Sequence, residues 1–240
     1  MHALANPLRF QHLADRIMPF VAWPLLVLAP IGLVWGLVYA PADYQQGEAY
    51  RIIYIHVPAA WMATETYALL AVASFAALVW RHPLAEVAAR AAAPVGATFT
   101  AIALVTGSIW GKPMWGTWWV WDARLTSVLI LFFLYLGYIA LHDAFEDPQR
   151  GARAAAILAL VGAVNLPVIK FSVDWWNTLH QPSSILKMGG SAVDPSMLHP
   201  LLLMILVFHL YLVLVVLLRI RLELAQRCLA ALRFQAAAGS

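Results

Sequence analysis

Residues 125–141, LTSVLILFFLYLGYIAL, form a run of seventeen residues without a charged side chain. A helix needs about 20 apolar residues to cross the ~30 Å hydrocarbon core of a bilayer, and this run approaches that length. Five other segments do the same, namely residues 20–39, 57–80, 92–110, 154–171 and 199–220. The pattern predicts an all-α integral membrane protein with six transmembrane helices, and a single domain covering residues 1–240.

The composition supports a membrane protein and excludes several other classes. Of the 240 residues, 63% are hydrophobic and 11% are charged, whereas soluble domains carry about a quarter charged residues. There is no basic run of five or more residues, so we expect membrane lipid and no nucleic acid as the anionic neighbour. The single cysteine, Cys228, excludes an internal disulfide and a thiolate metal cluster. Without a phosphate-binding loop motif, any ATP hydrolysis must come from a partner.

Basic residues are distributed unevenly over the two sides of the predicted bundle. Ten lie on one side: Arg9, Arg16, Arg81, Arg90, Arg150, Arg153, Arg219, Arg221, Arg227 and Arg233. Five lie on the other: Arg51, Lys112, Arg124, Lys170 and Lys187. Because Lys and Arg concentrate on the cytoplasmic side, we expect both termini in the cytoplasm. The connections near residues 40–56, 111–124 and 172–198 then face outward.

The segment just before residues 125–141 is rich in tryptophan. Residues 112–127, KPMWGTWWVWDARLTS, hold Trp115, Trp118, Trp119 and Trp121, followed by Asp122 and Arg124. We expect Gly111, Pro113 and Gly116 to end the third span, so that an amphipathic segment lies along the outer interface. If residues 115–122 are helical, Trp115, Trp118, Trp119 and Asp122 share one face.

Two interpretations of this segment stay open at this point. Tryptophans form belts at membrane interfaces, and Asp122 is suited to cap the fourth span. However, nine of the eleven tryptophans, Trp175 and Trp176 among them, fall on or near the outward side, and a belt does not need consecutive indoles. A large, flat, apolar ligand would need them, because indoles stack on a π-face at ~0.5–1.5 kcal/mol per pair beyond burial.

Outward histidines sharpen the second interpretation. His56 precedes Pro58, which suits the first turn of the second span, and His180 lies four residues after Trp176, on its side if that run is helical. Two neutral imidazoles beside tryptophans are able to bind a metal on opposite faces of a planar macrocycle, and haem iron suits this arrangement. His199 is the weaker candidate. Within the spans, we expect His209 and Glu65 to form hydrogen bonds between helices.

Arginines on the outward side match the other chemical needs of a haem. Arg51 and Arg124 are able to bind its two propionates, because guanidinium groups hold carboxylates in a bidentate manner. The alternative for Arg124 is a surface pair with Asp122 worth ~0–1 kcal/mol.

The motifs resemble a known family. WGTWWVWDARLTS looks like the tryptophan-rich WWD signature of haem-handling proteins, here at residues 111–127. YRIIYIHVPAAW and WWNTLHQPSS are similar to the corresponding segments of the haem exporter protein C (CcmC) family of the cytochrome c maturation system. The similarity covers nearly the whole chain.

The resemblance implies an inner-membrane protein that holds haem b as transient cargo at its periplasmic face. Its axial ligands would be His56 and His180, and its haem contacts would include Arg51, Arg124, Asp122 and the six tryptophans Trp115, Trp118, Trp119, Trp121, Trp175 and Trp176. The implied partners are a periplasmic haem chaperone (CcmE), ABC-type subunits (CcmA and CcmB) and a small one-span protein (CcmD). Such a protein is a transporter rather than an enzyme, with promotion of covalent haem attachment to its partner left open.

Competing functions make different demands on the depth of the histidines. A haem b subunit of a membrane oxidoreductase would bury bis-histidine pairs at mid-depth, whereas a delivery protein needs a site open at the surface. A transport permease would use its indoles for a cationic or aromatic solute and would leave the histidine pair unused.

Overall fold

The computed structural model describes residues 6–180, 191 and 193–238, and in these residues it contains helices and no strand. The helices are α1 (Pro7–Val34), α2 (Ile53–Trp80), α3 (Pro83–Trp115), α4 (Ala123–Asp143), α5 (Pro148–Gly162), α6 (Asn165–Trp175) and α7 (Pro195–Ala238). A π-helical turn, η2 (Trp35–Tyr39), extends α1, and a 3-10 turn, η3 (Glu48–Ile52), leads into α2. Lys187, one of the five outward basic residues, lies outside the described residues.

Within the part of the chain that the structure describes, six helical segments are long and apolar enough to cross a membrane, so the predicted fold class is confirmed. The fifth of them, Pro148–Trp175, consists of α5 and α6 together. It breaks at residues 163–164 because Pro167 has no N–H to donate to the carbonyl of Ala163. Asn165, the first residue of α6, attaches this break to α4, because its side-chain amide donates to the carbonyl of Ser127 at 2.8 Å.

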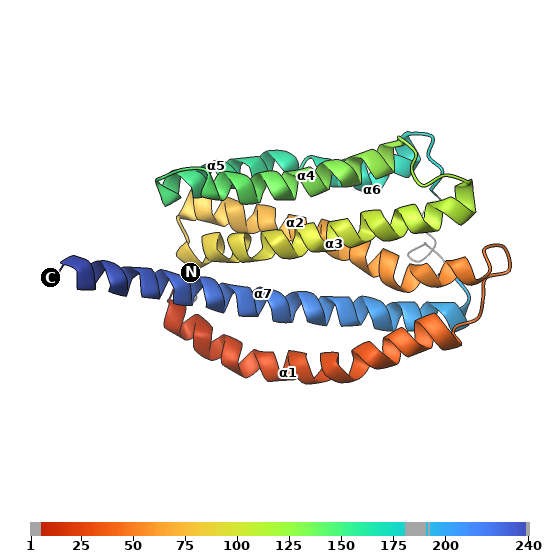
Figure 1. Cartoon of the computed structure of the whole chain (residues 1–240), viewed down its shortest axis with the longest axis horizontal. Coiled ribbons are helices and arrows are strands. Elements are labelled where there is room, and N and C mark those ends of the chain that lie inside the picture. The colour runs from red at the N-terminus through yellow and green to blue at the C-terminus, as the bar shows by residue number, and fades with distance from the viewer. Residues whose placement is uncertain (1–5, 181–190, 192, 239–240) are drawn as a thin grey trace.

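The helices form an elongated bundle with both termini at one end (Figure 1). In the view of Figure 1, α2 and α3 occupy the middle, α4 to α6 lie above them, and α7 and α1 lie below. We call the end with the termini the terminal end and the opposite one the distal end. The starts of α2, α4 and α7 and the ends of α3 and α6 therefore meet at the distal end.

The core lies between α2, α3, α4 and α5 and is built around two tyrosines. Tyr67 and Tyr135 are fully buried and meet edge to face, with ring centroids 5.0 Å apart. The hydroxyl of Tyr135 donates to the carbonyl of Ala63 at 2.8 Å, and its ring passes so close to Gly96 that a Cβ there would overlap it. This contact fixes how α2, α3 and α4 pack, and therefore where their distal ends lie.

The third span differs from the expectation at its outer end. α3 continues through Gly111 and Pro113 and ends only at Trp115, where Gly116 adopts the left-handed conformation with φ of 74°. Of the three predicted helix breakers, only Gly116 stops the helix, because its left-handed backbone conformation ends the helical hydrogen bonds. Residues 116–122 are not helical, so the shared helical face of Trp115, Trp118, Trp119 and Asp122 does not form.

Candidate functional site

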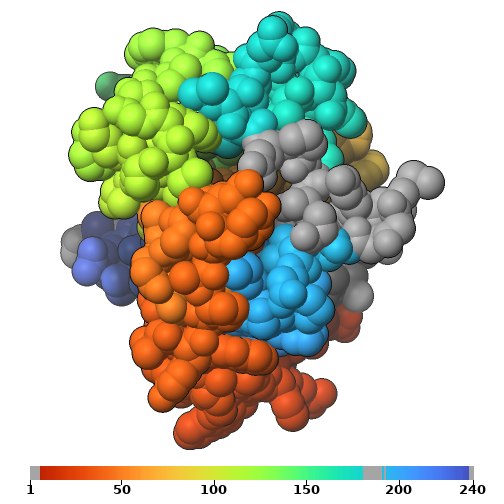
Figure 2. Space-filling model, turned by 90° about the vertical axis from the view of Figure 1, so that its right-hand side faces the viewer, coloured from red at the N-terminus to blue at the C-terminus, as the bar shows by residue number. Residues whose placement is uncertain are grey.

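The distal end brings together segments that are far apart in the sequence. Figure 2 views this end and shows the tryptophan-rich connection between α3 and α4 lying beside the end of α6, with residues near 40–56 adjoining them. Four of the tryptophans here are exposed: Trp118 at 57%, Trp121 at 75%, Trp175 at 56% and Trp176 at 49%. The end surface is therefore aromatic and accessible.

His56 lies in the first turn of α2, as predicted, and its ring is held by α3. Its Nδ1 lies 3.0 Å from the Oγ1 of Thr106. That hydroxyl donates its own proton to the carbonyl of Ile102 at 2.6 Å, so it acts as an acceptor toward the imidazole. We therefore assign the proton of neutral His56 to Nδ1, which leaves the lone pair on Nε2.

Small and aromatic residues of α3 complete the surroundings of His56. A Cβ on Gly107 would lie 3.0 Å from Cε1 of the imidazole, so the absence of a side chain at Gly107 allows the His56 ring to pack against α3. The indole of Trp110 meets the imidazole edge to face at 5.6 Å and donates from Nε1 to Gln46 at 2.9 Å. Sequence analysis missed Thr106, Gly107 and Trp110 as a group, although Thr106 and Trp110 have the i, i+4 spacing of one helix face.

His180 is held in a corresponding way by a carboxylate. Its Nδ1 lies 3.2 Å from Oδ2 of Asp122, and its ring meets Trp115 at 4.9 Å between centroids. Since an ionised carboxylate only accepts, Nδ1–H is the donor and Nε2 keeps its lone pair. Burial lowers the pKa of His180 below its usual value of 6.5, although the Asp122 carboxylate opposes this shift. The imidazole is thus neutral at pH 7.

Asp122 has two roles, one with each carboxylate oxygen. Oδ1 accepts from the backbone N–H of Leu125 at 2.7 Å, which confirms the predicted N-cap of α4. Oδ2 binds His180. The start of α4 and the orientation of the imidazole therefore depend on the same buried side chain, which is 8% exposed.

The structure brings His56 and His180 to one site. A positive charge on His180 would act on the imidazole of His56. Trp176 is not positioned as expected, because α6 ends at Trp175 and residues 176–180 are not helical. His199 is exposed in the first turn of α7.

The two arginines differ in how many of their donors are used. Arg51 pairs through Nε with Glu48 in η3, while its Nη1 is buried without a hydrogen-bond partner. Arg124 joins α4 to α6, because Nε donates to Ser172 at 3.1 Å and one Nη contacts the carbonyl of Ile169 at 3.4 Å. No ion pair between Asp122 and Arg124 forms in the described part of the chain.

The tryptophans of the 111–127 segment do not stack on one another as a single plate. Trp115 contacts His180, Trp119 meets Trp121 edge to face at 5.5 Å, and Lys112 lies over the ring of Trp118 at 5.9 Å. The Nε1 of Trp119 is buried without a partner. On the other side, Trp175 and Trp176 meet at 5.7 Å.

Polar residues inside the bundle behave as predicted. Nε2 of His209 lies 2.9 Å from Oε2 of Glu65, and its Nδ1 lies 2.8 Å from the carbonyl of Ile205. Both nitrogens are therefore engaged, and the pair connects α7 to α2 at mid-depth. His209 therefore has no free ring nitrogen with which to bind a metal.

Fold and site together define a polytopic membrane protein with a two-histidine, tryptophan-rich site at the end of its bundle. The family model described as "Heme exporter protein C" (CcmC) matches residues 1–235. The chain belongs to this family.

Similar proteins cover most of the chain. "Heme exporter protein C" of Bradyrhizobium diazoefficiens is 56% identical over 234 residues, which are 98% of this chain and 89% of the relative. The protein of the same name from Escherichia coli K12 is 55% identical over 201 residues, 84% of this chain and 81% of the relative. A "Putative cytochrome c biosynthesis ccmC-like mitochondrial protein" of Marchantia polymorpha is 50% identical over 193 residues, 80% of each chain.

Proposed function

We propose that the protein takes part in haem export for cytochrome c maturation by binding haem at its distal end. In this proposal the Nε2 atoms of His56 and His180 ligate the iron on its two faces. The observation that carries the proposal is that each imidazole has Nδ1 engaged by a protein acceptor, while its Nε2 has no hydrogen-bond partner in residues 6–180, 191 and 193–238. A metal-bound histidine has this arrangement, because the second nitrogen is held by an outer hydrogen bond.

The residues present fit a haem better than a bare metal ion. No group of three or more His, Cys, Asp and Glu side chains able to hold a metal occurs in the described residues. Two histidines suffice only where the bound group supplies the remaining ligands, as a porphyrin does. The indoles offer apolar, π-rich area to such a macrocycle. The names of the relatives, which are haem exporters, support the same cargo.

Arg51 is the better placed of the two propionate partners. Its buried Nη1 lacks an acceptor, and a buried unpaired donor costs ~1–3 kcal/mol, which a propionate oxygen would offset. Arg124 already donates two hydrogen bonds to α6, to Ser172 and Ile169. A contact with a propionate would therefore use its remaining Nη. Trp115, Trp118, Trp119, Trp121, Trp175 and Trp176, with Asp122 behind His180, complete the proposed haem contacts.

Position at the end of the bundle suits release of the haem. His56 lies at the start of α2 and His180 beyond the end of α6. Four tryptophans of the distal end are exposed, namely Trp118, Trp121, Trp175 and Trp176. A haem b subunit of an oxidoreductase would instead hold its haem at mid-depth, where His209 is occupied by Glu65. We therefore infer transient binding of haem b, not retention.

The proposed route of haem delivery is the one that membership of the haem exporter protein C family implies. The protein would lie in the inner membrane with both termini cytoplasmic, and the domain formed by residues 1–240 would present the 111–127 segment to the periplasm. Haem would pass to the periplasmic haem chaperone CcmE, with CcmA, CcmB and CcmD as further partners. The protein acts here as a transporter, since what it supplies is coordination and a surface for transfer.

Absorption spectroscopy of the purified protein tests the proposal. A Soret band and sharp α-band typical of bis-imidazole haem are expected, with one haem per chain. Orientation is tested separately by labelling single cysteines in intact cells, in a Cys228→Ser background. Gln45→Cys should react with an impermeant reagent and Gln149→Cys should not. The reverse pattern would place the site in the cytoplasm.

A further inference from the structure

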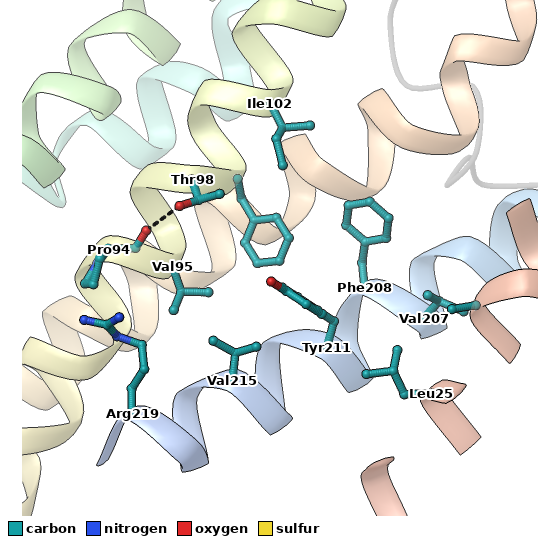
Figure 3. Close-up of a pocket in the computed structure, with 12 residues that line it drawn as sticks. Leu25, Pro94, Val95, Thr98, Ile102, Val207, Phe208, Tyr211, Val215 and Arg219 are labelled. Atoms are coloured by element: carbon teal, nitrogen blue, oxygen red, sulfur yellow. Dashed lines mark hydrogen bonds between the residues drawn. The ribbon is translucent and has the colours of Figure 1, made fainter. Parts of the chain in front are cut away.

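A lateral cavity of about 450 Å³ opens between α1, α3 and α7, away from the distal site (Figure 3). It exists because α1 packs mainly against α7 and leaves a space beside α3. Apolar side chains line it, among them Leu25 of α1, Phe99 of α3 and Phe208 of α7. Arg219 is the one basic residue in its lining.

The length of this groove corresponds to one leaflet of a bilayer. Along α7 its lining extends from Val207 to Arg219, and twelve residues at 1.5 Å each span ~18 Å. Half of a ~30 Å hydrocarbon core is ~15 Å. Arg219 lies toward the terminal end, and Val207 and Ile102 lie toward the middle of the bundle (Figure 3). The groove therefore runs from one membrane surface to mid-depth.

The width of the groove restricts what it is able to hold. With ~1.4 Å added on every side for the radius of a water-sized probe, a volume of about 450 Å³ over a length of ~18 Å corresponds to a cross-section of ~55 Å². A helix with a diameter of ~10 Å requires ~80 Å², so a partner helix does not fit between α1 and α3. A single extended hydrocarbon chain does.

Charge at the terminal end of the groove indicates an anionic head group. Arg219 is exposed, and its Nε donates to the carbonyl of Ala91 at 3.0 Å, which fixes the guanidinium beside α3. Its two Nη groups have no partner among the described residues. Guanidinium groups bind phosphate through paired hydrogen bonds, and basic residues at this depth attract anionic lipids.

Two hydroxyl groups line the groove besides the guanidinium of Arg219, those of Thr98 and Tyr211. The hydroxyl of Thr98 donates to the carbonyl of Pro94 within α3 at 2.8 Å (Figure 3). The ring of Tyr211 lies in the groove (Figure 3) and is 46% exposed. The remainder of the lining is apolar.

We propose that this groove binds one anionic phospholipid of the leaflet at the terminal end, with an acyl chain between α1 and α3 and its phosphate on Arg219. The lipid fills the space that α1 leaves open and joins α1 to α3. This inference does not depend on haem binding at the distal end.

Native mass spectrometry of the purified full-length protein tests this assignment, with phosphatidylglycerol and phosphatidylcholine as probes. The unaltered chain should retain phosphatidylglycerol in preference to phosphatidylcholine. Arg219→Gln should weaken phosphatidylglycerol binding about ten-fold, the effect of losing a charge-assisted contact. Arg153→Gln, which removes the same charge from an exposed position on α5, should leave binding unchanged.

A second variant tests the apolar part independently. Thr98→Trp fills the groove without altering Arg219, and it should lower retention of both lipids while the melting temperature shows that the chain stays folded. Equal phosphatidylglycerol retention by Arg219→Gln and Arg153→Gln would overturn the proposal. So would displacement of the lipid by haemin from a chain carrying His56→Ala and His180→Ala, because the groove would then be a cargo site.

Discussion

The two ends of the bundle use charged side chains in opposite ways. At the terminal end, Arg90 pairs with Asp143 at 3.1 Å and with Glu223 at 3.0 Å, and Arg227 pairs with Glu86 at 2.8 Å and with Glu223 at 2.9 Å. These contacts connect α3, α4 and α7. At the distal end, Arg51 has one carboxylate partner and a buried Nη1 without any.

The difference shows how a site is distinguished from a structural network. Arg90 and Arg227 use their donors on carboxylates of the same chain, so they join helices. At the distal end, His56, His180 and Arg51 each have one side-chain contact that fixes their orientation. Among the described residues, Nε2 of His56, Nε2 of His180 and Nη1 of Arg51 have no hydrogen-bond partner. A buried polar atom without a partner is costly, and under the proposed function a haem propionate would offset this cost at Nη1 of Arg51.

The largest effect is expected from removing an axial ligand. His56→Ala and His180→Ala should each abolish the bis-imidazole spectrum and lower the haem content of the purified protein, because iron loses one of two protein bonds. Soret and α-band spectra with pyridine haemochrome stoichiometry measure this. If both variants kept the unaltered spectrum, the assignment would be wrong, and His199 would be the next histidine to examine.

Removing aromatic area at the distal end should come next. A Trp118→Ala, Trp119→Ala double variant should fail to accumulate haem, whereas Trp118→Phe, Trp119→Phe should bind it with faster loss, since stacking and burial scale with flat apolar surface. Haem content of membrane-inserted protein and its rate of transfer to apomyoglobin distinguish the two. Normal haem binding by the alanine variant would leave these indoles as an interfacial belt.

Weakening the outer hydrogen bonds of the histidines should have an intermediate effect. Asp122→Asn and Thr106→Val should lower haem affinity about 10–100-fold, the usual cost of losing such a bond to a metal ligand. Thr106→Ser keeps the hydroxyl and should restore both the affinity and the spectrum. A Thr106→Ser variant as weak as Thr106→Val would show that only packing of the methyl group matters.

Arg51 should contribute to affinity without changing iron ligation. Arg51→Gln should weaken haem binding by ~1.5–3 kcal/mol, the range for a hydrogen bond to a charged group, while the α-band stays unchanged. Arg124→Gln is the matched comparison and should cost less haem affinity, because two of its donors already serve α6. Titration of the apoprotein with haem gives both values. Equal losses would contradict the different roles assigned to the two arginines.

The smallest effect on haem is expected at the terminal end. Arg90→Gln should leave haem affinity unchanged and lower stability by about 1 kcal/mol, because partly exposed ion pairs contribute ~0–1 kcal/mol each. Thermal unfolding and haem titration of the same sample separate the two quantities. If Arg90→Gln lowered haem affinity as much as Arg51→Gln does, the two ends of the bundle would not differ in their contribution to haem binding.

Several features of the site could be predicted from the sequence because they depend on local pattern. Apolar runs of membrane-spanning length predict helices wherever they occur, and all six are confirmed. Asp122 as an N-cap follows from its place before an apolar run. That Glu65 and His209 each make a hydrogen bond to another helix follows from the cost of ionisable groups in a membrane, whereas their pairing with each other came from the structure. The helical course expected for residues 115–122 was conditional, and Gly116 prevents it.

Hydrogen-bond partners of the histidines required the tertiary structure. Fifty residues separate His56 from Thr106, and 58 separate His180 from Asp122, so periodicity within one helix cannot pair them. The pairs form because the core around Tyr135 fixes how α2, α3 and α4 pack. The sequence by itself determined which residues span the membrane and which chemistry gathers on one side, since both depend on composition and spacing. Only the packed bundle decided which nitrogen of each imidazole is held and which is free, because that choice depends on a neighbour from another helix.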